Sequence, residues 1–222
     1  MRHTISKSWP GETCVILAGG PSLAMQDLSA LSIHRPKVIT INDSWRLWPY
    51  ADVFYFCDQE WYENQLDRNR LSLCQACHFR DLLVTGFWLK GGEELRSNPS
   101  FRHIPFTGQT GLETDPSGLR HGSNSSYAAI NLAYHYGVRK IILLGVDMQV
   151  VDGRTHWHDE KRPGGFDRIL RNTMLPLFDS LVEPLKSAGV EVINASSGSA
   201  LTCWLTMALE QALQPVLETV KT

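Results

Sequence analysis

GSNSSYAAINLAYHYG, residues 122–137, and its continuation VRKIILLGVDM, residues 138–148, decide the fold of this chain. A cluster of small and hydroxyl residues opens an alanine-rich helix, and Gly137 ends that helix. A buried apolar strand follows and carries Gly145 and Asp147 to the edge of a sheet. This arrangement predicts one half of a ligand site.

The turn LAGGPSL, residues 17–23, is expected to form the other half. An apolar strand over Cys14–Leu17 breaks there, and turns at the carboxyl ends of parallel strands meet where ligands bind. Gly19 and Gly20 let the backbone approach an anion closely, and a helix starting near Pro21 would aim free N–H groups at that anion. A side chain on Gly20 is therefore expected to occupy phosphate space and to leave the fold intact. Because the turn has neither a Walker lysine nor GxGxxG spacing, a plain tight turn remains the alternative.

Apolar, β-branched runs bounded by turn residues recur along the chain, and several are separated by stretches long enough for a helix. This is the pattern of a parallel sheet covered on both faces. We predict an α/β fold, a single-domain, doubly wound, mainly parallel sheet of Rossmann-like type over residues 1–222 with its core at about 13–213. The predicted strands are Thr13–Leu17, Lys37–Ile41, Val53–Phe56, Leu82–Thr85, Lys140–Leu144 and Val190–Ile193, with a weaker one over Arg102–Phe106.

Four segments are predicted to be helical. Asn172–Ser187 carries apolar residues at helical spacing, and Gly189 closes it. The other predicted helices are Tyr127–Tyr136, Leu201–Leu213 and a shorter one over Asp58–Asn69. Two stretches, residues 107–121 and 150–171, are rich in Gly, Pro, His and charge, and loops of this length are typically lids or binding segments.

Polar residues follow the second and third predicted strands. Asn42 and Asp58 come directly after these strands, so they are expected at the same sheet edge as the glycines if the strands flank the first one. Each residue is also a favourable N-cap for a following helix. Capping and ligand binding are compatible, and both interpretations stay open.

The loop after Asp147 contains two histidines, His156 and His158. Residues two positions apart in an extended segment point to the same side, and an imidazole exchanges a proton near neutral pH. Such a pair either takes part in acid–base chemistry or ligates a metal together with a carboxylate such as Asp147, Asp152 or Asp159. Basic residues crowd the same region and either neutralise an acidic substrate or solvate the loop; they are Arg154, Lys161, Arg162, Arg168 and Arg171.

Composition narrows the classes of partner. The formal net charge of −2 and a pI near 6.4 argue against a broad nucleic-acid-binding face, so a small-molecule partner is expected. No apolar run is long enough for a membrane span and no secretion signal is evident, which predicts a cytoplasmic protein. Five cysteines fit reduced thiols better than a disulfide framework, and the pair Cys74 and Cys77 lacks a second CxxC for a metal site.

Taken in order, "ILAGGPSL", "TIND", "FCDQEWY", "GSNSSYAAINLAYHYGVRKIILLGVDM" and "GVEVINASSGSAL" resemble the bacterial sialyltransferases that use CMP-sialic acid. The chain is also similar to the related 6-hydroxymethylpterin pyrophosphokinase-like proteins, and nearest to uncharacterised bacterial and phage members of that superfamily. The resemblance spans about residues 13–202. The helix-plus-strand segment and the Gly-Pro-Ser-Leu turn are its specific parts.

The resemblance implies a nucleotide-dependent transferase, foremost a glycosyltransferase with a CMP-sugar donor, an unknown acceptor and no required metal. It implies a histidine general base, with His158 first and His156 second, and Asp147 at the floor of the site with Gly145. The implied nucleotide contacts are Gly19, Gly20, Pro21, Ser22, Asn42, Asp58, Ser123, Asn124 and Ser125.

Departures from the sialyltransferase pattern keep other functions open. Gly19 stands where those enzymes have Asn, and the loop here lacks the tyrosines that hold the leaving phosphate there. Asp58 and Asp147 would suit a Mg²⁺-dependent pyrophosphokinase. A non-catalytic nucleotide-binding protein with this fold is the third possibility, and a homo-oligomer is equally open.

Overall fold

The computed structural model describes residues 3–58, 61–64, 81–84, 101–158 and 165–214. Within them, the main sheet has eight strands in the order β10-β9-β8-β1-β2-β3-β4-β5, and all neighbours are parallel. Its strands are β1 (Thr13–Leu17), β2 (Lys37–Ile41), β3 (Val53–Phe56), β4 (Asp81–Val84), β5 (Arg102–His103), β8 (Lys140–Leu144), β9 (Glu191–Asn194) and β10 (Leu205–Thr206).

The chain winds away from β1 in both directions. It first adds β2 to β5 on one side, then crosses over to add β8, β9 and β10 on the other. Leu17 at the end of β1 lies beside Thr40 of β2 and Leu144 of β8. The topological switch point is therefore next to β1, and sheets of this kind bind ligands outside the strand ends there. The predicted doubly wound, parallel α/β fold is confirmed.

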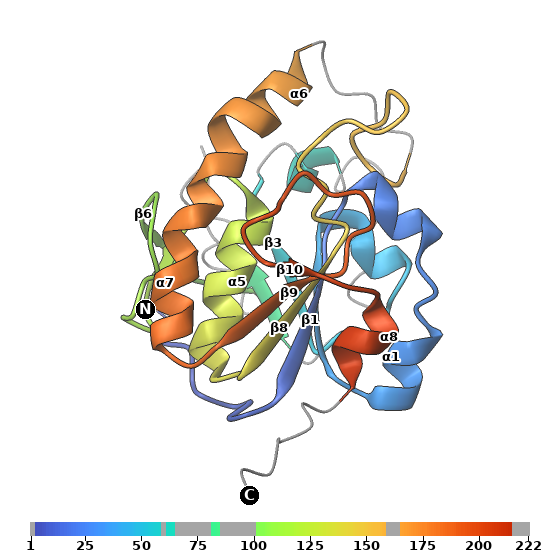
Figure 1. Cartoon of the computed structure of the whole chain (residues 1–222). Helices are drawn as coiled ribbons and strands as arrows, with labels where there is room; N and C mark the ends of the chain where they lie inside the picture. The colour runs from blue at the N-terminus through green and yellow to red at the C-terminus, as the bar shows by residue number, and fades with distance from the viewer. Residues whose placement is uncertain (1–2, 59–60, 65–80, 85–100, 159–164, 215–222) are drawn as a thin grey trace, which may run out of the picture.

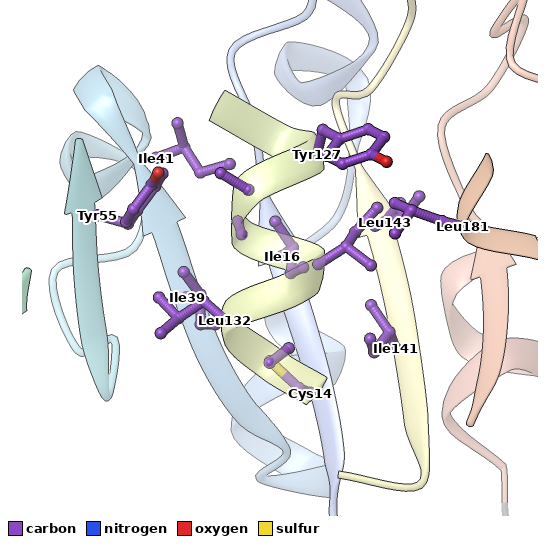
Figure 2. Packing of buried hydrophobic residues seen from close by; sticks show 14 of the residues in the cluster. Cys14, Ile16, Ile39, Ile41, Tyr55, Tyr127, Leu132, Ile141, Leu143 and Leu181 are labelled. Carbon is purple, nitrogen blue, oxygen red and sulfur yellow. The ribbon is translucent and has the colours of Figure 1, made fainter. Parts of the chain in front are cut away.

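Helices cover both faces of the sheet, as the alternation of buried side chains requires (Figure 1). One face carries Ile16, Ile39 and Leu143 and packs against α5 (Ser125–Tyr136) and α7 (Asp179–Ser187) (Figure 2). The opposite face carries Val15, Leu17 and Ile142 and packs against α1 (Ser29–His34) and α8 (Leu209–Leu213). Because these strands are buried on both faces, their sequences are continuous apolar runs.

Helix α5 lies in the core and points its first turn at the switch point. The Asn124 side chain caps it by accepting a hydrogen bond from Ser126 N at 2.8 Å, and Gly137 ends it with a φ of 89°. Its two most buried polar residues are satisfied: Asn131 accepts from the backbone N–H groups of Glu113 and Arg120, and His135 Nε2 lies 3.0 Å from Gly118 O. The predicted capped, glycine-terminated helix is confirmed.

Two predicted elements were wrong. The weak strand over Arg102–Phe106 divides into β5 and β6 (Phe106–Gly108), and β6 pairs with β7 (Leu119–Arg120) in a separate two-stranded sheet. Pro105 stands at the break, where it has no N–H to continue a ladder. The helix over Leu201–Leu213 is limited to α8, because Leu205 and Thr206 instead pair with Ile193 and Asn194 as strand β10.

The helix predicted to start at Asn172 begins earlier. A continuous helical stretch runs through α6 (Phe166–Ile169), a π-helical turn η3 (Leu170–Met174), a 3-10 turn η4 (Leu175–Phe178) and then α7. Pro176, which cannot donate to a regular helix ladder, accounts for the irregular turns. Within the predicted helix over Asp58–Asn69, the described residues 61–64 are helical. The cysteine pair Cys74 and Cys77 lies outside the described residues.

Among the residues that the structure describes, no helix combines the length and apolar character needed to span a membrane.

Candidate functional site

A pocket of about 230 Å³ opens at the carboxyl ends of β1, β2, β3 and β8. The turns after these strands meet there with the start of α5, the histidine loop and one side of the π-helical stretch. Of the residues that the sequence predicted for the site, Pro21 and Ser22 do not line the pocket. The others do: Gly19, Gly20, Asn42, Asp58, Ser123, Asn124, Ser125, Gly145, Asp147, His156 and His158.

The two glycines of the first turn make room for protein atoms. Gly20 N donates to Gly145 O at 2.7 Å, and a Cβ on Gly20 would lie 2.5 Å from that carbonyl oxygen and 2.7 Å from the Asp147 carboxyl carbon. A Cβ on Gly19 would lie 2.9 Å from the His156 ring. The expectation that a Gly20 side chain would leave the fold intact was therefore wrong, because it would push the β1 and β8 turns apart.

Asp147 ties these two turns together. Its carboxylate is 2% exposed and accepts hydrogen bonds from Ser22 N at 2.7 Å and from Ser22 Oγ. Burial raises the pKa of Asp147, and the hydrogen bonds from Ser22 offset part of the rise. Both oxygens are thus engaged, which assigns Asp147 and Ser22 a role in holding the turns rather than in free acid–base exchange.

The ends of β2 and β3 bring the polar side chains of Asn42 and Asp58 to the pocket. Asn42 has a φ of 50°, and its buried Oδ1 accepts no hydrogen bond from the described residues. It does not cap the 3-10 turn η2 (Asn42–Arg46), whose N-cap is Ile41, so the capping interpretation fails for Asn42. The capping interpretation holds for Asp58, whose Oδ1 accepts a hydrogen bond from Trp61 N at 3.2 Å.

Asp43 is a pocket residue that the sequence analysis missed. Its side chain is 3% exposed, and its Oδ2 accepts from Trp61 Nε1 at 2.7 Å. The signal was present in "TIND", where a second polar residue follows Asn42 at the strand end. The contact with Trp61 joins the ends of β2 and β3 and was not visible in the sequence.

The start of α5 presents hydroxyl groups and a helix N-terminus to the pocket. Ser123, with a φ of 53°, is held by a hydrogen bond from its N–H to His121 Nδ1 at 2.9 Å and by one from Gln109 Nε2 to its Oγ at 3.0 Å. Burial lowers the pKa of His121, which keeps its ring neutral and able to accept. Because the start of α5 lines the pocket, the positive end of the helix dipole faces it, which is a favourable position for an anion.

The histidine loop lies across the first turn. Trp157 N donates to Gly19 O at 2.9 Å, and the Arg46 guanidinium lies 5.3 Å from the centre of the Trp157 ring. The rings of His156 and His158 stack with centroids 5.3 Å apart, so the prediction that they share one side is confirmed. His158 Nε2 lies 3.8 Å from Asp43 Oδ2.

The described pocket wall is acidic. It carries Asp43, Asp58 and Asp147, and no lysine or arginine among its described residues. Of the predicted basic cluster, Arg171 pairs with Asp167 at 3.0 Å, while Lys161 and Arg162 lie outside the described residues, as does Asp159. Asp152 is exposed and does not line the pocket, and the described part of the chain contains no group of three or more His, Cys, Asp or Glu placed to hold a metal ion.

Neither a protein family nor a curated protein matches this sequence, but solved structures match its fold. The sialyltransferase CstII from Campylobacter jejuni in complex with the substrate analogue CMP-3FNeuAc overlays with a TM-score of 0.56 and 13% identity, over 92% of this chain and 89% of that one. CstII with cytidine-5'-monophosphate overlays with a TM-score of 0.58 and 14% identity, over 90% of this chain and 86% of that one. CST-II with a trisaccharide acceptor and CMP overlays with a TM-score of 0.56 and 14% identity, over 92% of this chain and 89% of that one. The fold is therefore sialyltransferase-like.

Proposed function

We propose that this chain is a nucleotide-dependent transferase, specifically a sialyltransferase-like glycosyltransferase that takes a CMP-sugar donor. The observation that carries the proposal is the convergence of His156 and His158, Asn42 and the α5 N-terminus on one pocket at the switch point. The match to CstII structures that contain CMP or a CMP-sugar analogue, over nine-tenths of the chain, supports the choice of donor.

The pocket residues supply the contacts that such a donor needs. The phosphate binds at the start of α5, where Ser123, Asn124 and Ser125 add hydroxyl and amide groups to the helix dipole. Asn42 offers its buried amide oxygen to an N–H or O–H group of the nucleotide, since leaving that oxygen without a partner is costly. Met148, Leu170 and Met174 add an apolar section to the pocket wall, and the sulfur atoms of both methionines lie 3.8 Å from Asn124 Nδ2.

His158 is the general base of the proposed reaction. It takes the proton of the acceptor hydroxyl as the oxygen forms a bond to the anomeric carbon of the donor sugar. The bond from that carbon to the phosphate oxygen breaks, and CMP leaves with the electron pair. General-base assistance of this kind contributes roughly 10²–10⁴ to the rate.

Replacement of His158 tests this assignment. With CMP-sialic acid as donor and water as acceptor, His158→Ala is expected to lower kcat by roughly 10²–10⁴ with little change in CMP affinity. His156→Ala should have a smaller effect. The wild-type rate should rise with pH as the His158 imidazole loses its proton, and this limb should disappear in His158→Ala. A wild-type rate in folded His158→Ala would remove the base assignment.

The acidic wall favours one second candidate, a Mg²⁺-dependent diphosphate transfer. Carboxylates such as Asp58 would hold a cation that neutralises the transferred group. EDTA separates the two proposals. Turnover of CMP-sialic acid that survives EDTA supports the glycosyltransferase, whereas diphosphate transfer from ATP that requires Mg²⁺ and is lost in Asp58→Asn would replace it.

A further inference from the structure

Asp43 is a buried carboxylate at the pocket wall that is only partly satisfied. Its Oδ2 accepts one hydrogen bond from Trp61 Nε1, and its Oδ1 accepts none from the described residues, although the side chain is 3% exposed. Burial of a carboxylate costs several kcal/mol unless opposite charge and hydrogen bonds compensate. The position therefore calls for a positively charged or proton-donating neighbour.

Besides Trp61, the described residues Arg46 and His158 face Asp43. Arg46 Nη1 lies 3.8 Å from Oδ1, but the Arg46 side chain is 39% exposed and its charge is screened by solvent. His158 Nε2 lies 3.8 Å from Oδ2, with its side chain 13% exposed. Of the other groups around His158, His156 stacks on its ring and Trp157 meets it edge-on, while Asp159 and Glu160, which follow in the sequence, lie outside the described residues.

We propose that Asp43 is a positioning residue for His158, a role that rests on the proposed function of this pocket. Asp43 directs the Nε2–H of the neutral imidazole toward its carboxylate, so that Nδ1 takes the acceptor proton. Once that proton arrives, the cationic ring and the carboxylate form a charge-assisted pair in a site shielded from water. The proton stays on His158 during sugar transfer, and Asp43 stays ionised.

Trp61 makes the arrangement specific. The hydrogen bond from Trp61 Nε1 to Asp43 Oδ2 fixes the orientation of the Asp43 carboxylate. The backbone N–H of Trp61 in turn donates a hydrogen bond to Asp58 Oδ1. The end of β3 thus orients a side chain from the end of β2, which in turn orients a histidine from the loop after β8.

Nitrogen NMR of the wild-type protein tests the orientation without relying on turnover. In ¹⁵N-histidine-labelled protein, with His158 assigned by loss of its signals in His158→Ala, the neutral ring is expected to carry its proton on Nε2. A neutral ring protonated on Nδ1 would overturn the proposal.

A pH titration of the same signals tests the charge. Asp43→Asn keeps an acceptor for Trp61 but removes the negative charge, so the His158 midpoint should fall by about one pH unit. Asp58→Asn removes an equal charge from the same pocket and should move the midpoint less. A midpoint unchanged in Asp43→Asn, or moved as far by Asp58→Asn, would contradict the pairing.

Kinetics separates this inference from the proposed function. With CMP-sialic acid, Asp43→Asn should lower kcat by about 10–100-fold while the affinity for CMP stays within about twofold. Equal losses of CMP affinity and rate would make Asp43 a ligand contact and overturn the positioning role. If the wild type does not turn over CMP-sialic acid, the proposed function fails, and the NMR measurements still decide whether Asp43 and His158 form a pair.

Discussion

Gly20 shows how closely the two central turns approach each other. Its φ of −67° is accessible to any residue, so the conflict on substitution is purely steric. Gly20→Ala places a Cβ against the Gly145 carbonyl and the Asp147 carboxyl, and overpacking of this kind is expected to lower the free energy of unfolding by about 1–3 kcal/mol.

Gly19→Ala is the matched control, because its Cβ meets the His156 side chain rather than backbone. Urea unfolding of both variants should show the larger loss at Gly20. Equal stability of Gly20→Ala and the wild type would mean that the two turns are not held this closely.

His135 makes the stability of the protein depend on pH. Burial lowers the pKa of this imidazole, while the carbonyl of Gly118 and nearby carboxylates offset part of that effect. Because the folded-state pKa lies below the unfolded value of ~6.5, the contribution of neutral His135 to stability is fully present above the unfolded pKa. This contribution is lost as the pH falls through the folded-state pKa. His135→Gln should therefore lose less stability than the wild type between pH 7.5 and pH 5.

Exposed His34 provides the comparison, and His34→Gln should follow the wild-type curve. Chemical unfolding at several pH values measures the difference. Identical acid sensitivity of His135→Gln and the wild type would contradict the prediction.

At the scale of elements, the start of α5 combines a structural cap with the proposed phosphate site. Asn124→Ala removes the bond to Ser126 N and should cost about 1 kcal/mol of unfolding free energy. Asn124→Asp keeps the cap and suits the helix dipole, but it places a negative charge where the phosphate is proposed to bind. Its stability should match the wild type while its CMP affinity falls by about tenfold or more, as calorimetry would measure.

The pair of variants distinguishes the two roles. If Asn124→Asp binds CMP as well as the wild type, the phosphate does not lie at the start of α5. The stability effect of Asn124→Ala would stand in that case, because it depends only on the cap.

Central elements could be predicted from the sequence, and edge elements could not. The predicted bounds of β1, β2, β3 and β8 agree with the structure because both of their faces are buried, which gives long apolar runs. Strand β10 has two exposed residues, Leu205 and Thr206, and depends on pairing with β9. Such pairing leaves no hydrophobic pattern, so local helix propensity misled the prediction there.

At the scale of the molecule, the sheet order explains why most of the site could be predicted and part of it could not. Strand-end residues such as Asn42, Asp58 and Asp147 were recognisable because parallel strands all end at one edge. The contact between Asp43 and His158, and the one between Ser22 and Asp147, join segments more than a hundred residues apart. Single-sequence patterns have a range of a few turns and carry no information about such contacts.

The whole molecule should be stabilised by CMP, the nucleotide of the proposed donor. Because a ligand that binds only the folded state stabilises it by mass action, CMP at 100 times its Kd should add about 2.7 kcal/mol to the free energy of unfolding and raise Tm measurably. The contacts proposed at Asn42 and at the α5 N-terminus lie in one pocket, so Asn42→Ala and Asn124→Asp should each reduce this shift. A thermal-shift series with CMP, UMP and AMP, with and without Mg²⁺, measures it. Pyrimidine nucleotides should give the largest shift and Mg²⁺ should add little. A shift by AMP alone that requires Mg²⁺ would contradict the CMP-sugar proposal and favour diphosphate transfer at the same pocket.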